Sequence, residues 1–117
     1  MPFNDIEKQR IEKVVGGFCE KRIPEHLRNQ IKLIHEIRGY DVKIIECRPY
    51  FLNSHEWTES PVARMKYDPK TSKWQLYWKR ASGKWWKYPD REPTNRLEDL
   101  IDEIQKDPHH VFLGVTR

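Results

Sequence analysis

Aromatic rings and lysines alternate along residues 73–88, which hold four of the chain's five tryptophans. Such rings stack on the bases of single-stranded nucleic acid while lysines neutralise its phosphates, and a sheet face can present both. The residue types at two-residue spacing predict a nucleic-acid-binding surface made of Lys73, Gln75, Tyr77, Lys79, Lys84 and Trp86. The alternative interpretation is that the rings belong to the core and that the lysines extend past them to water.

This stretch is typical of a β-hairpin. Alternation along residues 73–80 sends Trp74, Leu76 and Trp78 to one face and the lysines to the other. Residues 81–83, Ala-Ser-Gly, form a three-residue loop in which Gly83 supplies the left-handed backbone. The sequence leaves open which face the helices cover. If they cover the lysine face, the exposed surface is instead made of Trp74, Trp78, Arg80, Trp85 and Lys87.

Carboxylates near the middle of the chain offer a different chemistry. Asp41, Glu46 and Arg48, with Glu12 or Glu20 from the preceding helix, resemble the carboxylate-and-cation set that holds Mg²⁺ for phosphodiester hydrolysis. The spacing is shorter than that pattern uses, and an arginine cannot act as a base. The alternative is a surface ion pair between Glu46 and Arg48.

The histidines do not form a recognisable metal motif. The segment 55–59, His-Glu-Trp-Thr-Glu, ends in glutamate where a zinc helix has its second histidine. His109 and His110 are adjacent, so on a strand they point in different directions. We therefore predict no metal, no cofactor and no catalytic residue.

Charge is distributed unevenly over the 117 residues, whose net charge is +4. Residues 1–59 carry ten basic and ten acidic side chains, whereas residues 60–93 carry nine basic and three acidic ones. The local excess falls on the aromatic hairpin region, where it can concentrate anionic partners. A solubilising face is the alternative explanation of this excess.

Two amphipathic helices flank the strands. Asn4 with Glu7 forms a capping box before the apolar residues at 11, 14, 15 and 18. Gly16 and Gly17 interrupt this stripe, which indicates close backbone packing against a strand. The alternative is a bend of the helix at a functional hinge. A second helix is predicted to start at an Asn95 cap, with a buried stripe of Leu97, Leu100, Ile101 and Ile104.

Alternating patterns predict strands at residues 30–37, 42–48 and 61–67, ahead of the hairpin. We expect the intervening residues 50–60 to be an ordered loop, because Pro49 stops strand pairing. Residues 111–115 are expected to add an edge strand. The predicted fold is α+β: an N-terminal helix, a five-stranded antiparallel meander and a C-terminal helix, with the helices on one sheet face and residues 1–117 in a single domain.

Location follows from what the sequence lacks. No apolar run approaches the roughly 20 residues of a membrane span, and the first residues do not resemble a signal peptide. We therefore expect a cytoplasmic protein without membrane contact. Cys19 and Cys47 are expected to be reduced, buried thiols.

Four strings along the chain form a distinctive set: GGFCEKRIP at 16–24, ECRP at 46–49, WTESPVAR at 57–64 and WQLYW at 74–78. In this order they resemble the strings of a small bacterial family, the domain of unknown function 3024. The resemblance covers nearly the whole chain. It implies a single-domain bacterial protein with no assigned activity and no catalytic residues.

The sequence favours a non-enzymatic module that binds single-stranded RNA or DNA through a basic aromatic sheet face. The first alternative is a protein-interaction or dimerisation module, whose exposed rings pack on a protein partner or a second copy. The second is a divalent-metal phosphodiesterase that uses the carboxylates described above.

Overall fold

The structure is a computed structural model, and it describes residues 3–50, 52–109 and 111–112. Its elements, in chain order, are α1 (Asp5–Ile11), a π-helical turn η1 (Glu12–Gly16), α2 (Gly17–Arg22), a 3₁₀ turn η2 (Glu25–Leu27), β1 (Lys32–Arg38), β2 (Asp41–Tyr50), β3 (Asn53–Asp68), β4 (Lys73–Lys79), β5 (Trp85–Lys87) and α3 (Leu97–Lys106). All strand pairs are antiparallel, in the order β1-β2-β3-β4-β5. The predicted α+β meander between two helical segments is confirmed.

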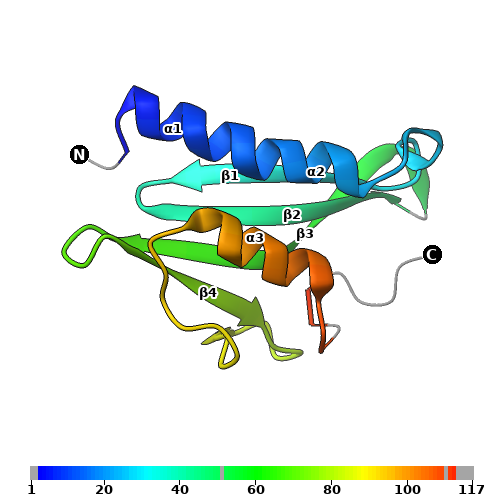
Figure 1. The fold of residues 1–117 in the computed structure, drawn as a ribbon. Coiled ribbons are helices and arrows are strands. Elements are labelled where there is room, and N and C mark those ends of the chain that lie inside the picture. The colour runs from blue at the N-terminus through cyan, green and yellow to red at the C-terminus, as the bar shows by residue number, and fades with distance from the viewer. Residues whose placement is uncertain (1–2, 51, 110, 113–117) are drawn as a thin grey trace.

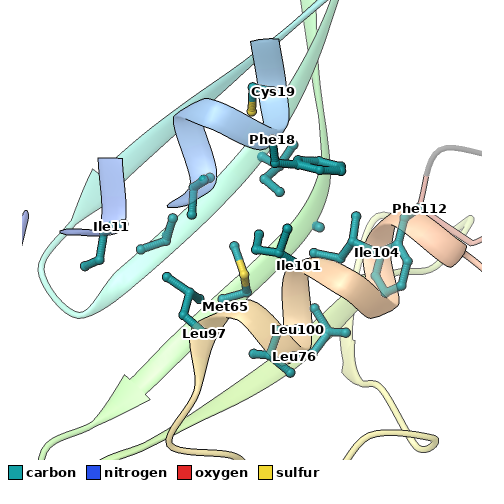
Figure 2. Packing of buried hydrophobic residues seen from close by; sticks show 14 of the residues in the cluster. Ile11, Phe18, Cys19, Met65, Leu76, Leu97, Leu100, Ile101, Ile104 and Phe112 are labelled. Carbon is teal, nitrogen blue, oxygen red and sulfur yellow. The ribbon is translucent and has the colours of Figure 1, made fainter. Parts of the chain in front are cut away.

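Both helical segments lie on the same face of the sheet (Figure 1). They meet the strands in one hydrophobic cluster, where Figure 2 shows Ile11, Phe18, Leu100 and Ile104 directed toward the sheet. The strands contribute alternate residues to this cluster, namely Leu33, Val42, Ile44, Ala63, Met65, Trp74 and Leu76. The opposite face of the sheet has no helix packed on it within the described chain.

The first helix begins as the sequence indicates. The Asn4 side chain accepts a hydrogen bond from the Glu7 N–H at 2.8 Å, and the Glu7 carboxylate accepts one from the Asn4 N–H at 2.9 Å. Further along, a Cβ added to Gly16 would lie 3.3 Å from Cε1 of His35, on β1. The close packing predicted at the two glycines is thus confirmed at Gly16, where the neighbour is a side chain of β1, and is wrong at Gly17, where an added Cβ would meet nothing within 4 Å. The π-helical turn η1 ends at Gly16.

The expectation of a loop over residues 50–60 is wrong. β2 continues to Tyr50 and β3 starts at Asn53, so the two strands form a ribbon that extends past their neighbours. Pro49 is tolerated because β1 stops flanking β2 at the Lys32–Cys47 pair. Residues 48–50 and 52–60 are therefore a two-stranded extension of the sheet, which we call the arm.

A bulge separates the arm from the main sheet. Ile44 pairs with Ala63 and Ile45 pairs with Pro61, which leaves Val62 as the extra residue of β3. Adjacent residues on a strand point to opposite faces, yet Ile44 and Ile45 are both buried. The mixed pattern of β2 in the sequence therefore reflects both a bulge and burial on both faces.

The β4–β5 hairpin has the predicted three-residue loop. Backbone hydrogen bonds run from the Arg80 N–H to the Lys84 carbonyl and from the Gly83 N–H to the Arg80 carbonyl, both at 2.8 Å. Gly83 has a φ of 89°, in the left-handed region that favours glycine. This loop fixes how β4 and β5 are aligned.

The second helix starts later than predicted, and Asn95 does not cap it. Thr94 exchanges two backbone hydrogen bonds with Trp74, which holds the chain extended beside β4 until α3 starts at Leu97. The Thr94 hydroxyl, and not the side chain of Asn95, accepts from the Arg96 N–H at 3.1 Å. The predicted stripe of Leu97, Leu100, Ile101 and Ile104 is buried as expected.

Both cysteines are free and buried, as predicted. Burial raises the pKa of Cys19 from 9.0 to about 12, and burial followed by the charge of Glu59 raises the pKa of Cys47. No helix among the described residues is long and apolar enough to cross a membrane. Most of the strand predicted for residues 111–115 lies outside the described residues, and Val111 and Phe112 form a bend.

Candidate nucleic-acid interface

The sheet face away from the helices, which we call the open face, carries a row of side chains that crosses all five strands. Directly paired residues point to the same side of a sheet. Tyr77 pairs with Arg64 on one side and with Lys87 on the other. Arg64 pairs in turn with Lys43, and Lys43 with Glu36. Tyr77 therefore lies between cations from both neighbouring strands.

The rings on this face contact those cations. The Lys66 Nζ lies 5.8 Å from the centroid of the Tyr77 ring, and the Arg64 Cζ lies 5.9 Å from that of Trp85. Trp85 pairs with Lys79, and this pair lies two residues along each strand from the Tyr77–Lys87 pair. Tyr77 and Trp85 are thus diagonal neighbours on β4 and β5, with both side chains half-buried.

Arg64 is fixed by Asp41 at the start of β2. Its Nη2 lies 2.6 Å from Asp41 Oδ2, and its Nε donates to the same oxygen at 2.8 Å. Both side chains are mostly covered, with exposed fractions of 25% and 18%. The pair neutralises itself and positions Arg64 beside Trp85.

The lysines of the open face are not neutralised in this way. Among the residues that the structure describes, no carboxylate forms an ion pair with the five open-face lysines, which are Lys43, Lys66, Lys73, Lys79 and Lys87. Their charge is therefore available to an anionic ligand.

A shallow groove of about 610 Å³ crosses one end of this face. Its wall includes Tyr77, Gln75 and three of the lysines, Lys66, Lys73 and Lys87. The β3–β4 turn and the connection from β5 to α3 also line the groove, and each contributes an acidic residue, Asp68 and Glu92. The groove places one ring and several cations around a space that a ligand can enter.

Four of the six residues predicted from the sequence lie together on the open face. Lys73, Gln75, Tyr77 and Lys79 alternate along β4 with the buried Trp74 and Leu76. The Gln75 amide Nε2 already donates to the carbonyl of Leu76 at 2.9 Å.

The other two predicted residues, Lys84 and Trp86, do not join them. Trp86 pairs with Trp78 and points to the helix side, where its side chain is 52% exposed. There the Arg80 guanidinium lies 4.4 Å from the Trp86 ring centroid and 5.2 Å from that of Trp78. Lys84 precedes β5 and is exposed at the loop. Grouping Trp86 with Tyr77 was therefore wrong in register.

The residues that take their place are Trp85 and Lys87 from β5 and Arg64 and Lys66 from β3. The three-residue hairpin loop is the feature of the sequence that could have identified Trp85 and Lys87. When residues 81–83 form the loop, Arg80 faces Lys84, and counting back along both strands brings Lys87 opposite Tyr77 and Trp85 opposite Lys79. Arg64 and Lys66 required the β3–β4 pairing, which the sequence pattern alone does not give.

The carboxylates considered for phosphodiester hydrolysis do not converge. Asp41 lies on the open face and is paired with Arg64, whereas Glu46 points to the other side of β2. Glu46 accepts from the Arg48 Nε at 2.9 Å, the local pair that was the alternative interpretation. Glu12 and Glu20 are exposed on the first helix.

Titratable side chains form one further cluster, where the chain leaves β5 and passes α3. The Tyr88 hydroxyl donates to Glu103 at 2.9 Å, Arg91 lies 3.4 Å from the same carboxylate, and His109 contacts Asp90. Burial, and then the hydrogen bond to Glu103, raise the pKa of Tyr88. Within the described part of the chain, no three histidine, cysteine or acidic side chains are grouped closely enough to hold a metal ion.

These features define a class: an α+β domain in which a five-stranded antiparallel meander has helices on one face and a basic, aromatic open face on the other. Residues 3–114 match the family described as Domain of unknown function (DUF3024), and the chain belongs to that family. No curated protein and no solved structure matches the chain.

Proposed function

We propose that the open face binds single-stranded RNA or DNA and that the protein is a non-enzymatic binding module of the bacterial cytoplasm. The observation that carries the proposal is the pair of diagonal rings, Tyr77 and Trp85, surrounded by lysines that have no ion-pair partner in the described chain. Diagonal neighbours on paired strands lie about 7–8 Å apart, which suits adjacent bases of an extended strand.

The rings supply the sequence-tolerant part of the affinity. Stacking of one base on an aromatic side chain contributes about 1–3 kcal/mol, because every base has a π-face. Tyr77 and Trp85 are half-buried, so part of each ring is packed against its neighbours. This packing limits the entropy lost when a base stacks on the ring.

The lysines supply the electrostatic part. Each contacted phosphate releases counterions, so the logarithm of the affinity falls with the logarithm of salt concentration, with a slope of about −0.7 per neutralised phosphate for single strands. Lys66, Lys73 and Lys87 line the groove beside Tyr77. Contacts from these three would give a slope near −2, with Lys43 and Lys79 adding to it.

The test is fluorescence anisotropy of labelled single-stranded oligonucleotides, RNA and DNA, titrated with the protein at several salt concentrations. Trp85→Ala is expected to weaken binding about tenfold, the effect of losing one stacked base. Trp86→Ala is the matched control, because this neighbouring tryptophan points to the helix side. Lys87→Gln should make the salt slope shallower by about 0.7, the share of one phosphate contact, whereas Lys84→Gln should leave it unchanged.

The outcomes separate the candidates. Absence of binding at low salt would overturn the proposal, and equal losses for Trp85→Ala and Trp86→Ala would show that the open face is not the site. Cleavage of the oligonucleotide that requires Mg²⁺ and is lost in Glu46→Gln would favour the phosphodiesterase instead.

A second candidate, a surface for a protein partner, rests on Trp86. Its exposed ring, with Arg80 stacked on it, is the combination that interface hot spots favour. An aromatic protein interface weakens little with salt, unlike a phosphate-binding one. Salt-insensitive binding of a protein that is lost in Trp86→Ala, together with no affinity for oligonucleotides, would favour this candidate.

A further inference from the structure

A ligand in the groove of the open face meets acidic side chains as well as lysines. Asp68 and Glu92 line the groove together with Lys66, Lys73 and Lys87. Carboxylates repel phosphates, so acidic residues in a site for a nucleic-acid backbone lower the affinity. In such a site the carboxylates suit a different part of the ligand, one that donates hydrogen bonds.

Glu92 is the acidic residue of the groove that is available to such a donor. Its side chain is exposed, and within the described chain it forms neither an ion pair nor a hydrogen bond. Asp68, in contrast, already accepts the Lys70 N–H on its Oδ1 at 2.9 Å. Both carboxylate oxygens of Glu92 can therefore accept from a ligand.

The backbone around Glu92 is attached to the sheet. Two residues further on, Thr94 exchanges backbone hydrogen bonds with Trp74 at 2.6 and 3.0 Å. Trp74 pairs on its other side with Tyr67 of β3, so Thr94 lies along the β5 edge of β4. Pro93, between them, has a fixed φ and favours an extended backbone at Glu92. Glu92 is therefore held beside β4, within two residues of a sheet contact.

Guanine is the base whose hydrogen-bond donors match one carboxylate. Its Watson–Crick edge presents the N1–H and the N2 amino group side by side, and single-stranded bases are commonly bound by this edge. The two oxygens of a carboxylate can accept from both donors, in the paired geometry that carboxylates form with arginine. Adenine and cytosine offer one amino group next to acceptors, and uracil offers one N–H between two carbonyls.

We propose that the groove selects a guanine base of the bound single strand. The base stacks on Tyr77, and the Glu92 carboxylate accepts from its N1–H and its N2 amino group. The inference rests on the nucleic-acid binding proposed above, and both residues line the same groove of about 610 Å³. The lysines of the groove contact the phosphates next to this base. The interface is thus base-selective at Tyr77 and sequence-tolerant at Trp85.

The first test changes the ligand and leaves the protein unaltered. Fluorescence anisotropy compares labelled oligouridine strands of equal length that carry guanosine, inosine, adenosine or uridine at the central position. The guanosine strand should bind about tenfold more tightly than the uridine strand, a discrimination typical of one bidentate contact. Inosine lacks the N2 amino group and should lose most of this gain. Adenosine measures what a purine gains by stacking alone, and its strand should bind within about twofold of the uridine strand.

The second test removes the carboxylate. Glu92→Gln keeps the size of the side chain, replaces one acceptor oxygen by an amino group and removes one negative charge from the groove. The affinity for the guanosine strand should fall to within about twofold of that for the uridine strand. The affinity for the uridine strand should rise about threefold, because a charge that repels phosphates is lost. The two strands therefore respond in opposite directions.

Glu36→Gln is the matched control. Glu36 lies on the open face opposite Lys43, its Oε2 is 3.7 Å from the Arg38 Nη2, and it is not part of the groove wall. This substitution makes the same change in net charge. The affinities for the guanosine and uridine strands should therefore change by the same factor, and their ratio should stay near tenfold.

The outcomes separate this inference from the proposed function. Equal affinity for the four strands would overturn the selection of guanine and leave the binding of single strands in place. A guanosine preference that persists in Glu92→Gln, or one that inosine retains in full, would also overturn it. Absence of binding by every strand at low salt would instead overturn the proposed function.

Discussion

The two faces of β4 use the same residue types for different purposes. On the helix side Leu76 is fully buried and Trp74 is 6% exposed, the latter stacked on Phe3 with ring centroids 5.5 Å apart. On the open face Tyr77 is half-buried and flanked by cations from both neighbouring strands. The parity of a position along the strand, more than the residue type, therefore decides whether a ring supports the core or is available to a ligand.

β5 extends this comparison to adjacent tryptophans. Trp85 lies with Tyr77 on the open face, while Trp86 lies with Trp78 on the helix side but beyond the core cluster, where it is exposed. Exposure alone would select Trp86 as the binding residue. The nearby cations favour Trp85 instead, since the five open-face lysines, which form no ion pair among the described residues, share its face.

The largest expected effect separates stability from binding on neighbouring residues. Leu76→Ala removes a fully buried side chain and should lower the free energy of unfolding by about 2–5 kcal/mol. Tyr77→Ala, on the open face, should cost about 1 kcal/mol. Urea denaturation followed by circular dichroism measures both, and similar losses for the two variants would contradict the assignment of faces.

A smaller loss of stability is expected from a substitution at Tyr88, the buried residue that follows β5. Tyr88→Phe removes the hydrogen bond to Glu103 and should lower the free energy of unfolding by about 1.5–3 kcal/mol near neutral pH. Because the folded-state pKa of Tyr88 is raised, its stabilisation is complete below the ordinary tyrosine pKa of about 10 and is lost as pH rises above it.

The measurement is thermal unfolding of the wild type and Tyr88→Phe from pH 7 to 11. The difference in stability between them should be constant up to about pH 10 and shrink above it. A difference that grows with pH would contradict a raised pKa for Tyr88.

A substitution at Asp41 tests whether charge on the open face controls the affinity for oligonucleotides. Asp41→Asn removes the carboxylate that pairs with Arg64 and adds one positive charge to the net charge of this face. Oligonucleotide affinity should rise about threefold, while stability falls by about 1 kcal/mol. Asp102→Asn, on the exposed side of α3, makes the same change in net charge and should leave the affinity unchanged. Equal increases would mean that net charge, rather than position, controls binding.

The smallest effects contrast two adjacent glycines of the first helix. Gly17→Ala should stabilise the protein by about 0.5–1 kcal/mol, because the backbone is helical and a Cβ there meets nothing within 4 Å. Gly16→Ala should lack this gain, since its Cβ would lie 3.3 Å from His35. Melting temperatures of the two variants make the comparison, and equal gains would show that the helix can move away from β1.

Local patterns predicted much of this fold from the sequence. The Asn4 cap, the stripe of α3 and the hairpin loop at 81–83 each depend on a few neighbouring residues, and all three are confirmed. The errors arose where pairing with distant residues decides the outcome. Thr94 is held by Trp74, and Pro49 is tolerated because β1 has already ended.

In the candidate site, too, residues placed by a local pattern were predicted and residues placed by pairing between strands were not. Alternation on one strand was sufficient for Tyr77 and the lysines of β4. Trp85 and Lys87 required the register across the loop, and Arg64 required the pairing of β3 with β4. Its ion pair with Asp41, which is 23 residues away, has no local signal in the sequence.

The strand order also bears on how the chain folds. Each strand pairs only with its neighbours in sequence. Every pair of adjacent strands is therefore a hairpin, and no pair needs a crossover connection. Contacts between residues close in sequence lower the entropy lost before the first contacts form, and they correlate with fast folding. The sheet can therefore assemble hairpin by hairpin. The contact between the first helix and α3, at opposite ends of the chain, is the long-range step expected to come last.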